Sequence, residues 1–90
     1  MTLNIDLLKK KIIYRSNYRG TKEMDKLLGA FTSKYINLLN DDDLISLEKL
    51  LNVSDDDLYN FYNGTKTEVK FKENNIIKLF KKFRYNKDDK

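Results

Sequence analysis

The sequence predicts a small all-α domain, a bundle of five helices formed by a single chain of 90 residues. Apolar residues recur at intervals of three and four along most of the chain, which is the period of an amphipathic helix. The chain contains no proline, so a helix is not interrupted by a residue that lacks a backbone N–H. It also contains no cysteine, so stability must come from a packed core. At this length we expect one core, and therefore one domain spanning residues 1–90.

The first two helices are predicted over residues 4–16 and 21–39. In the first, Leu8 and Ile12 lie four residues apart, as on one helix face. A polar stretch that ends in Gly20 separates the two. The second helix has the clearest three-and-four spacing of the chain, carried by Met24, Leu27, Leu28, Phe31, Tyr35 and Leu38.

Three further helices are predicted in the second half of the chain. The third begins at Asn40 or Asp41 and carries Leu44, Leu47, Leu50 and Leu51. The fourth follows Ser54 and ends at Asn63-Gly64, because glycine adopts the left-handed conformation without steric cost. The fifth carries Ile76, Ile77, Phe80 and Phe83 and ends near Tyr85. The alternation over 69–72 has strand spacing but no partner strand, so a loop is expected there, and residues 86–90 are expected to fray.

Two runs of three aspartates, Asp41–Asp43 and Asp55–Asp57, fall where the third and fourth helices begin. Carboxylates in a first helical turn accept from free N–H groups and oppose the positive end of the helix dipole. The alternative is a metal site, but the spacing and central glycine of a calcium-binding loop are missing. We therefore predict helix N-termini here and no metal site.

The composition argues against an enzyme. The chain has no histidine and no cysteine, which removes the commonest general base, the commonest metal ligand and the thiolate nucleophile. The remaining polar residues show no catalytic spacing. No glycine-rich phosphate-binding motif is present, so no tightly bound cofactor is expected. A binding protein, monomeric by default, is the predicted class.

Charge is strongly segregated along the chain, although its formal net value is only +4. Residues 1–40 carry a net charge of +5, residues 41–57 a net charge of −6, and residues 66–90 a net charge of +5. An acidic middle segment is unusual for a protein that binds nucleic acid along its whole surface, and separated patches suit a partner of complementary charge.

The last predicted helix keeps a nucleic-acid-binding alternative open. Its cations are interleaved with Phe80, Phe83 and Tyr85, and they are Lys78, Lys81, Lys82, Arg84 and Lys87. The competing interpretation, which we favour, is an amphipathic helix whose aromatic rings pack inward while its lysines face water.

The first thirteen residues contain no long apolar run, so neither a signal peptide nor a membrane span is expected. They are also poor in the Arg and Ser of a transit peptide. We therefore expect the protein in the bacterial cytoplasm, with the mitochondrial matrix as the alternative.

The break between the first two helices is the most unusual stretch. Gly20 allows a sharp turn that another backbone can approach closely. Arg19 offers a rigid fork of donors for a carboxylate or phosphate, and Glu23 lies one turn into the next helix. Such a corner either binds a partner or fixes the turn.

This stretch carries a family resemblance. Arg19-Gly20-x-x-Glu23, followed by Asp25 and Leu27-Leu28-Gly29-x-Phe31, resembles the signature of the SdhE-type flavinylation factors, also called succinate dehydrogenase assembly factors. Asp55-x-Asp57-Leu58-Tyr59-x-Phe61 resembles the family's second block, with Phe61 in place of its usual Trp.

The resemblance implies a five-helix protein that binds the flavoprotein subunit of succinate dehydrogenase, or that of fumarate reductase. It implies that the factor promotes covalent attachment of FAD to a histidine of that subunit, so FAD belongs to the partner. Arg19, Gly20 and Glu23 would contact the partner, with Arg19 pairing with a carboxylate or carbonyl of it. Glu23 would accept donors from the partner or hold Arg19 in place. Further candidates on the same corner are Arg15, Tyr18 and Asp25.

Overall fold

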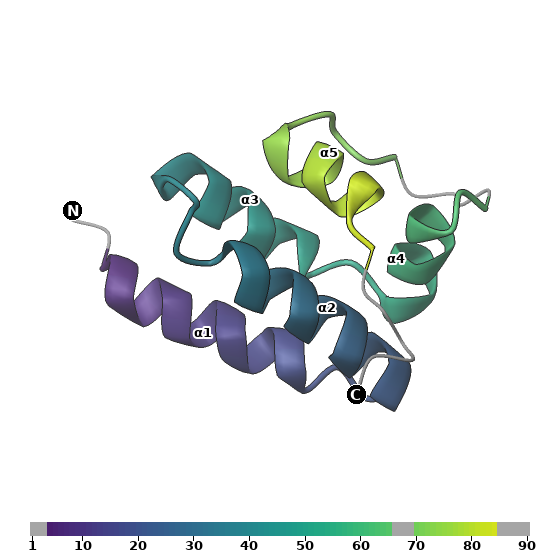
Figure 1. Ribbon diagram of the computed structural model, residues 1–90, viewed down its shortest axis with the longest axis horizontal. Coiled ribbons are helices and arrows are strands. Elements are labelled where there is room, and N and C mark those ends of the chain that lie inside the picture. The colour runs from purple at the N-terminus through teal and green to yellow at the C-terminus, as the bar shows by residue number, and fades with distance from the viewer. Residues whose placement is uncertain (1–3, 66–69, 85–90) are drawn as a thin grey trace.

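The computed structural model describes residues 4–65 and 70–84 and confirms the all-α prediction. The helices, drawn in Figure 1, are α1 (Ile5–Asn17), α2 (Lys22–Tyr35), α3 (Asp41–Leu50), α4 (Asp55–Tyr62) and α5 (Asn75–Lys82). No strand occurs among the described residues.

α1 and α2 form an antiparallel pair joined by a short turn, and this pair is one side of the molecule (Figure 1). α3 packs against α1, and α5 packs against both α3 and α4. The turn between α1 and α2 therefore lies at the same end of the molecule as the connection from α3 to α4 (Figure 1).

A polar side chain caps the N-terminus of every described helix. In each case its oxygen accepts a hydrogen bond from the backbone N–H three residues later, and the capping residues are Asn4, Thr21, Asn40, Ser54 and Asn74. These caps satisfy donors that have no partner within the helix. The aspartate runs 41–43 and 55–57 occupy the first turns of α3 and α4, as predicted.

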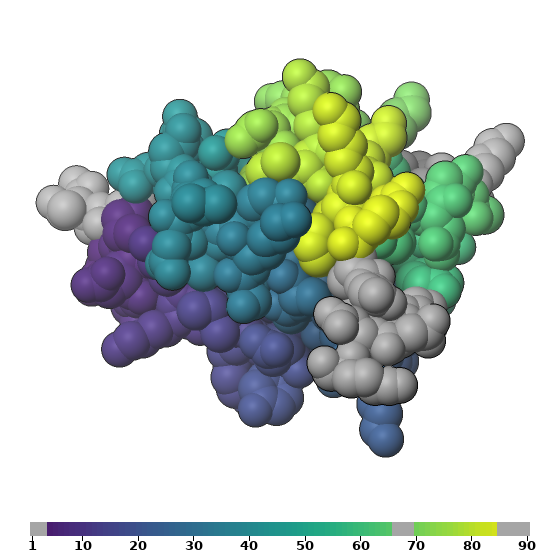
Figure 2. Space-filling model, viewed as in Figure 1, coloured from purple at the N-terminus to yellow at the C-terminus, as the bar shows by residue number. Residues whose placement is uncertain are grey.

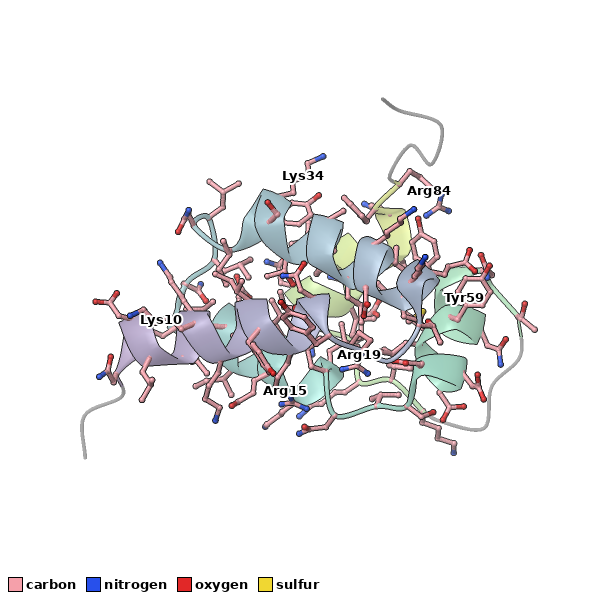
Figure 3. All side chains as sticks on the ribbon, turned by 90° about the horizontal axis from the view of Figure 1, so that it is seen from below. Lys10, Arg15, Arg19, Lys34, Tyr59 and Arg84 are labelled. Atoms are coloured by element: carbon pink, nitrogen blue, oxygen red, sulfur yellow. The ribbon has the colours of Figure 1, made fainter. Side chains whose placement is uncertain are left out.

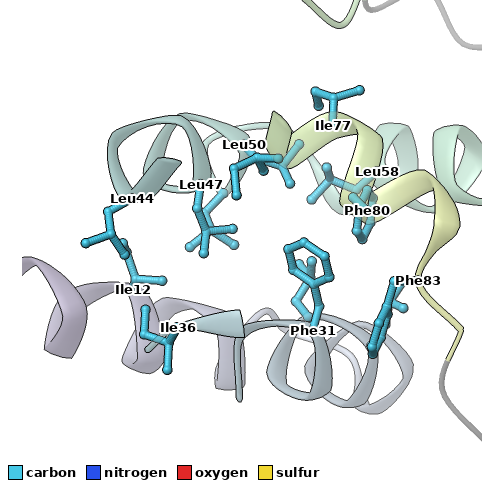
Figure 4. Packing of buried hydrophobic residues seen from close by; sticks show 14 of the residues in the cluster. Ile12, Phe31, Ile36, Leu44, Leu47, Leu50, Leu58, Ile77, Phe80 and Phe83 are labelled. Atoms are coloured by element: carbon cyan, nitrogen blue, oxygen red, sulfur yellow. The ribbon is translucent and has the colours of Figure 1, made fainter. Parts of the chain in front are cut away.

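The core is built around aromatic rings from α2, α5 and the residue after α5 (Figure 4). The ring of Phe31 lies 5.4 Å from those of Phe80 and Phe83, edge to face in both cases. Phe31 and Phe80 are fully buried and Phe83 is 5% exposed. The prediction that aromatic residues of the last helix face inward is confirmed for these rings, while Tyr85 and Lys87 lie outside the described residues.

The predicted end of α2 is wrong. The helix stops at Tyr35 instead of continuing to residue 39, because the chain tightens into a turn in which the Leu38 N–H donates to the Tyr35 carbonyl at 2.8 Å. In this turn the Ile36 side chain packs into the core at 5% exposure, whereas that of Leu38 is 77% exposed. Leu38 is therefore not the core residue that its spacing predicted.

α5 is also shorter than predicted, because it ends at Lys82. Phe83 adopts an extended backbone with φ −65° and ψ 134°, which lets its ring return to Phe31. Of the segment 69–72, residue 69 lies outside the described residues. Phe71 is in a loop, as expected, and its ring contacts that of Phe61 at 4.1 Å.

A buried pair of hydroxyls joins α1 to α2. Ser16 and Thr32 are 0% and 1% exposed, and their side-chain oxygens lie 2.7 Å apart. Ser16 Oγ also lies 2.7 Å from the Ile12 carbonyl, which accepts a hydrogen bond from it. A hydroxyl buried without a partner is costly, so the pair fixes how the two helices face each other.

We expect Ser16→Ala and Thr32→Val each to lower the free energy of unfolding by about 1 kcal/mol. The double variant should lose less free energy of unfolding than the sum of the two single losses, because the two hydroxyls are hydrogen-bonded to each other. Urea unfolding of the three variants measures this coupling, and Ser33→Ala, at an exposed neighbour on α2, is the control. Strict additivity would show that the hydroxyl contact does not contribute.

Candidate functional site

The turn between α1 and α2 is held by the backbone itself. Gly20 has a φ of +122°, a conformation that residues with a side chain rarely adopt. The nearest atom to a Cβ placed there would be Asp55 Oδ2 at 4.0 Å, so glycine is required by the backbone and not by lack of space. The Arg19 N–H donates to Asp25 Oδ1, and Thr21 caps α2. The turn is thus fixed at both of its ends.

The side chain of Arg19 fastens this turn to the connection between α3 and α4. Nε donates to Asp55 Oδ1 at 2.8 Å, Nη1 to the Leu51 carbonyl at 2.7 Å, and Nη2 to the Val53 carbonyl at 2.8 Å. The Arg19 side chain is only 10% exposed, and that of Asp55 is 25% exposed. The two carbonyls follow the end of α3, where the last helical carbonyls lack partners within the helix. We call this set of contacts the Arg19 clamp.

Arg15 reinforces the Arg19 clamp from one turn earlier in α1. Its Nη2 donates to the Leu51 carbonyl at 3.1 Å and to Asn52 Oδ1 at 2.6 Å. Both arginines therefore meet at the same carbonyl, and Figure 3 shows them side by side facing this connection. The guanidinium groups of Arg15, in α1, and Arg19, in the turn after it, thus bind backbone that lies more than thirty residues further along the sequence.

These contacts change the roles that the sequence assigned. The donors of Arg19 were predicted to reach a carboxylate or carbonyl of a partner, but they are engaged by acceptors of this chain. Asp55, and not Glu23, supplies the carboxylate that holds Arg19. Asp25 and Arg15, predicted as further contact candidates, also bind within the corner. The two arginines and Asp25 thus hold the corner together through hydrogen bonds within this chain.

Asp55 was not predicted as part of this site. Only a role at the N-terminus of its helix was expected for it, although the residue opens the second family-like block. An arginine in one block and an aspartate in the other were the available signal for an ion pair between them.

The exposed part of the corner consists of Tyr18, Gly20 and Glu23. Tyr18 is 69% exposed, and the other two are also exposed at the surface. The hydroxyl of Tyr59, from α4, lies 3.5 Å from Glu23 Oε1 (Tyr59 is labelled in Figure 3). The predicted site residues thus all lie at this corner, where Tyr18, Gly20 and Glu23 are exposed and Arg15, Arg19 and Asp25 are half-buried.

A shallow hollow of about 220 Å³ adjoins the corner between the start of α2 and α4. Its lining residues are Thr21, Glu23, Met24, Asp55, Asp56 and Tyr59. Three of them are carboxylates, one of which is already paired with Arg19. The surface beside Gly20 is therefore acidic and favours a cationic side chain of a partner.

None of the helices that the structure describes is long and apolar enough to span a bilayer. Two cations near the C-terminal end contact aromatic rings: Lys81 Nζ lies 5.8 Å from the ring centroid of Phe61, and the Arg84 guanidinium lies 5.1 Å from that of Tyr62. Part of the basic surface that suggested nucleic-acid binding therefore covers aromatic side chains of α4.

Comparison with known proteins gives consistent matches. A family model described as flavinator of succinate dehydrogenase matches residues 10–84. A Kluyveromyces lactis protein named succinate dehydrogenase assembly factor 2, mitochondrial, is 34% identical over 89 residues, covering 94% of this chain and 55% of the relative. A protein of that name from Lodderomyces elongisporus is 33% identical, covering 87% of this chain and 50% of the relative. One from Saccharomyces cerevisiae is 32% identical, covering 93% of this chain and 54% of the relative.

The chain thus spans about half the length of the curated relatives it matches. No solved structure matches it significantly. The prediction of a bacterial cytoplasmic location is wrong, because these relatives are designated mitochondrial. The family resemblance read from the two blocks is confirmed. Since the family model covers most of the chain, including the Arg19 corner and the second block, the chain belongs to the flavinator of succinate dehydrogenase family.

Proposed function

We propose that this chain binds the flavoprotein subunit of succinate dehydrogenase and promotes the covalent attachment of FAD to it, in mitochondria. Membership of the flavinator family over residues 10–84 is the observation that carries this proposal. The relatives named as succinate dehydrogenase assembly factor 2 support it.

The chemistry of attachment belongs to the partner in this proposal. The residue that receives the flavin comes from the flavoprotein, which fits a chain that has no histidine or cysteine. FAD likewise stays with the flavoprotein. What this chain contributes is a surface that favours the arrangement of the flavoprotein in which flavin and acceptor residue react.

The geometry of the corner suits that task because the backbone that carries its exposed groups is held in place by hydrogen bonds. The Arg19 clamp holds the turn against the connection between α3 and α4, which fixes Gly20 and the first turn of α2. A surface that is ordered before binding loses less conformational entropy when the complex forms. Glu23 and the acidic hollow would accept a cationic side chain of the flavoprotein, while Gly20 would let its backbone approach.

Glu23→Gln tests the corner with little change of shape. We expect it to slow covalent flavin attachment about tenfold, because a charge-assisted contact is worth about 1.5–3 kcal/mol. The measurement combines the purified flavoprotein subunit, FAD and this chain, and follows flavin fluorescence of the denatured flavoprotein band over time.

Asp42→Asn is the matched control, because Asp42 is also an exposed carboxylate in the first turn of a helix. Both variants lose similar helix-dipole stabilisation, so their melting temperatures should agree within a few degrees. Equal rates of flavin attachment for the two variants would remove Glu23 from the binding surface. If the wild-type chain does not raise the rate of flavin attachment above that of the flavoprotein subunit and FAD alone, the proposed function is refuted.

A further inference from the structure

α1 has large apolar side chains on its outer face as well as toward the core. Leu8 and Ile12 are buried, as expected for a surface helix. Of the five exposed large hydrophobic residues found in the described part of the chain, three lie on α1 and a fourth directly follows it. They are Leu7 (56% exposed), Ile13 (42%) and Tyr14 (65%) on the helix, and Tyr18 (69%) after it. Contiguous exposed apolar residues on a small protein indicate a surface that another molecule covers.

The C-terminal half of this outer face is shaped for contact. Lys10, Ile13, Tyr14, Asn17 and Tyr18 recur at intervals of three and four and line an open hollow of about 500 Å³. The rings of Tyr14 and Tyr18 lie 4.7 Å apart, so each limits the movement of the other. Tyrosine offers a large contact area with few rotatable bonds, which makes it a frequent anchor of protein interfaces. We call these five residues the α1 outer face.

The α1 outer face continues into the corner described above. Tyr18 is the residue before Arg19, and Gly20 follows directly. Because the Arg19 clamp fixes this end of α1, the tyrosine pair is held at a constant position relative to the corner. In Figure 2, α1 forms the lower left flank of the molecule, and Figure 3 shows α1 from its uncovered side, with Lys10 labelled.

Charge on α1 selects the chemistry of the occupant. α1 carries four cations, Lys9, Lys10, Lys11 and Arg15, and a single carboxylate, Asp6. Lys11 pairs with Glu48 at 3.2 Å and Arg15 binds the connection after α3, whereas Lys10 lines the hollow beside the tyrosines. The α1 outer face therefore complements apolar side chains accompanied by an acidic one.

We propose that the α1 outer face docks a segment of the flavoprotein subunit that presents apolar side chains to Ile13, Tyr14 and Tyr18 and a carboxylate to Lys10. This inference rests on the proposed function. It adds a second surface to the acidic corner, so that two patches of opposite charge align the partner in one orientation. The partner should accordingly present a cationic group and a carboxylate on either side of the position that faces Gly20.

The test is a titration of the purified flavoprotein subunit with wild-type chain and with Tyr14→Ser/Tyr18→Ser. We expect the dissociation constant of the double variant to be at least about tenfold higher, as for loss of aromatic anchors at an interface. Leu38→Ser is the matched control, because Leu38 is 77% exposed and lies in the connection at the other end of α2. Its dissociation constant should equal that of the wild type. Thermal melting of each variant checks that the fold is retained.

Lys10→Glu tests the charge independently of the apolar contact. Wild-type affinity should fall with added salt, and Lys10→Glu should bind more weakly at low salt and depend less on salt. Binding by Tyr14→Ser/Tyr18→Ser within twofold of the wild type would overturn the inference while the proposed function stands. A wild-type dimer that the double variant converts to monomer would overturn it too, because the face would then serve a second copy. No binding by the wild type would refute the proposed function and this inference together.

Discussion

Replacing Arg19 with alanine is expected to lower the free energy of unfolding by about 3 kcal/mol, although Arg19 lies at the candidate binding corner. The change leaves Asp55 and the carbonyls of Leu51 and Val53 without the donors that they have now. Hydrogen bonds to charged groups contribute about 1.5–3 kcal/mol, and removing one partner of a recessed ion pair costs more than the pair gains. For a domain of this size the melting temperature should fall by about 12–24 °C.

Two further variants show whether the Arg19 clamp is the cause. Arg19→Lys keeps the charge but loses the planar fork that reaches three acceptors, so it should recover only part of the stability. In a double-mutant cycle with Asp55→Ala, the two changes should be less than additive. An Arg19→Ala protein as stable as the wild type would mean that this arginine is free to act as a contact for the partner.

Replacing Phe31 with alanine is expected to cost about 3–5 kcal/mol, the largest effect of any single change considered. Phe31 is fully buried, and its ring contacts those of Tyr35, Phe80 and Phe83. Its removal opens a cavity where α2 meets the C-terminal part of the chain. Since a domain of this length is stabilised by only about 5–13 kcal/mol, a large share of the total would be lost. Chemical unfolding in urea measures the difference.

Phe31→Leu is the control for this prediction. Leucine fills much of the volume but makes no edge-to-face ring contact, so its cost should be clearly smaller than that of alanine. Equal costs for the two variants would show that the ring contacts, and not the filled volume, dominate the stability of this region. A loss below about 1 kcal/mol for Phe31→Ala would show that the Phe31 ring is not important for the stability of the core.

The helices could be predicted from the sequence because their signals are local. Asn40, Ser54 and Gly64 mark helix ends through their own backbone and side-chain preferences, and the structure places helix boundaries beside each of them. Leu27, Leu28 and Phe31 follow from helical spacing and are fully buried. The end of α2 could not be predicted, because the turn after Tyr35 depends on Ile36 packing into a core that the local spacing does not describe.

The location of the candidate site could be predicted from the sequence, but the hydrogen bonds within it could not. Arg19, Gly20 and Glu23 do meet at one corner. The partners of Arg19 lie 32 to 36 residues away, and two of them are backbone carbonyls, which carry no mark in a sequence. Only the folded arrangement of α1 against α3 shows that this arginine faces inward.

Hydrogen–deuterium exchange of this chain, alone and with the purified flavoprotein subunit, tests most directly whether the Arg19 corner is the binding surface. Backbone amides at 18–23 should exchange more slowly in the complex, together with those at the start of α4, where Asp56 lines the acidic hollow. Amides at 36–40, at the other end of α2, should exchange at the same rate in both samples. Slower exchange confined to 36–40 or to α5, with no change at 18–23, would contradict this account.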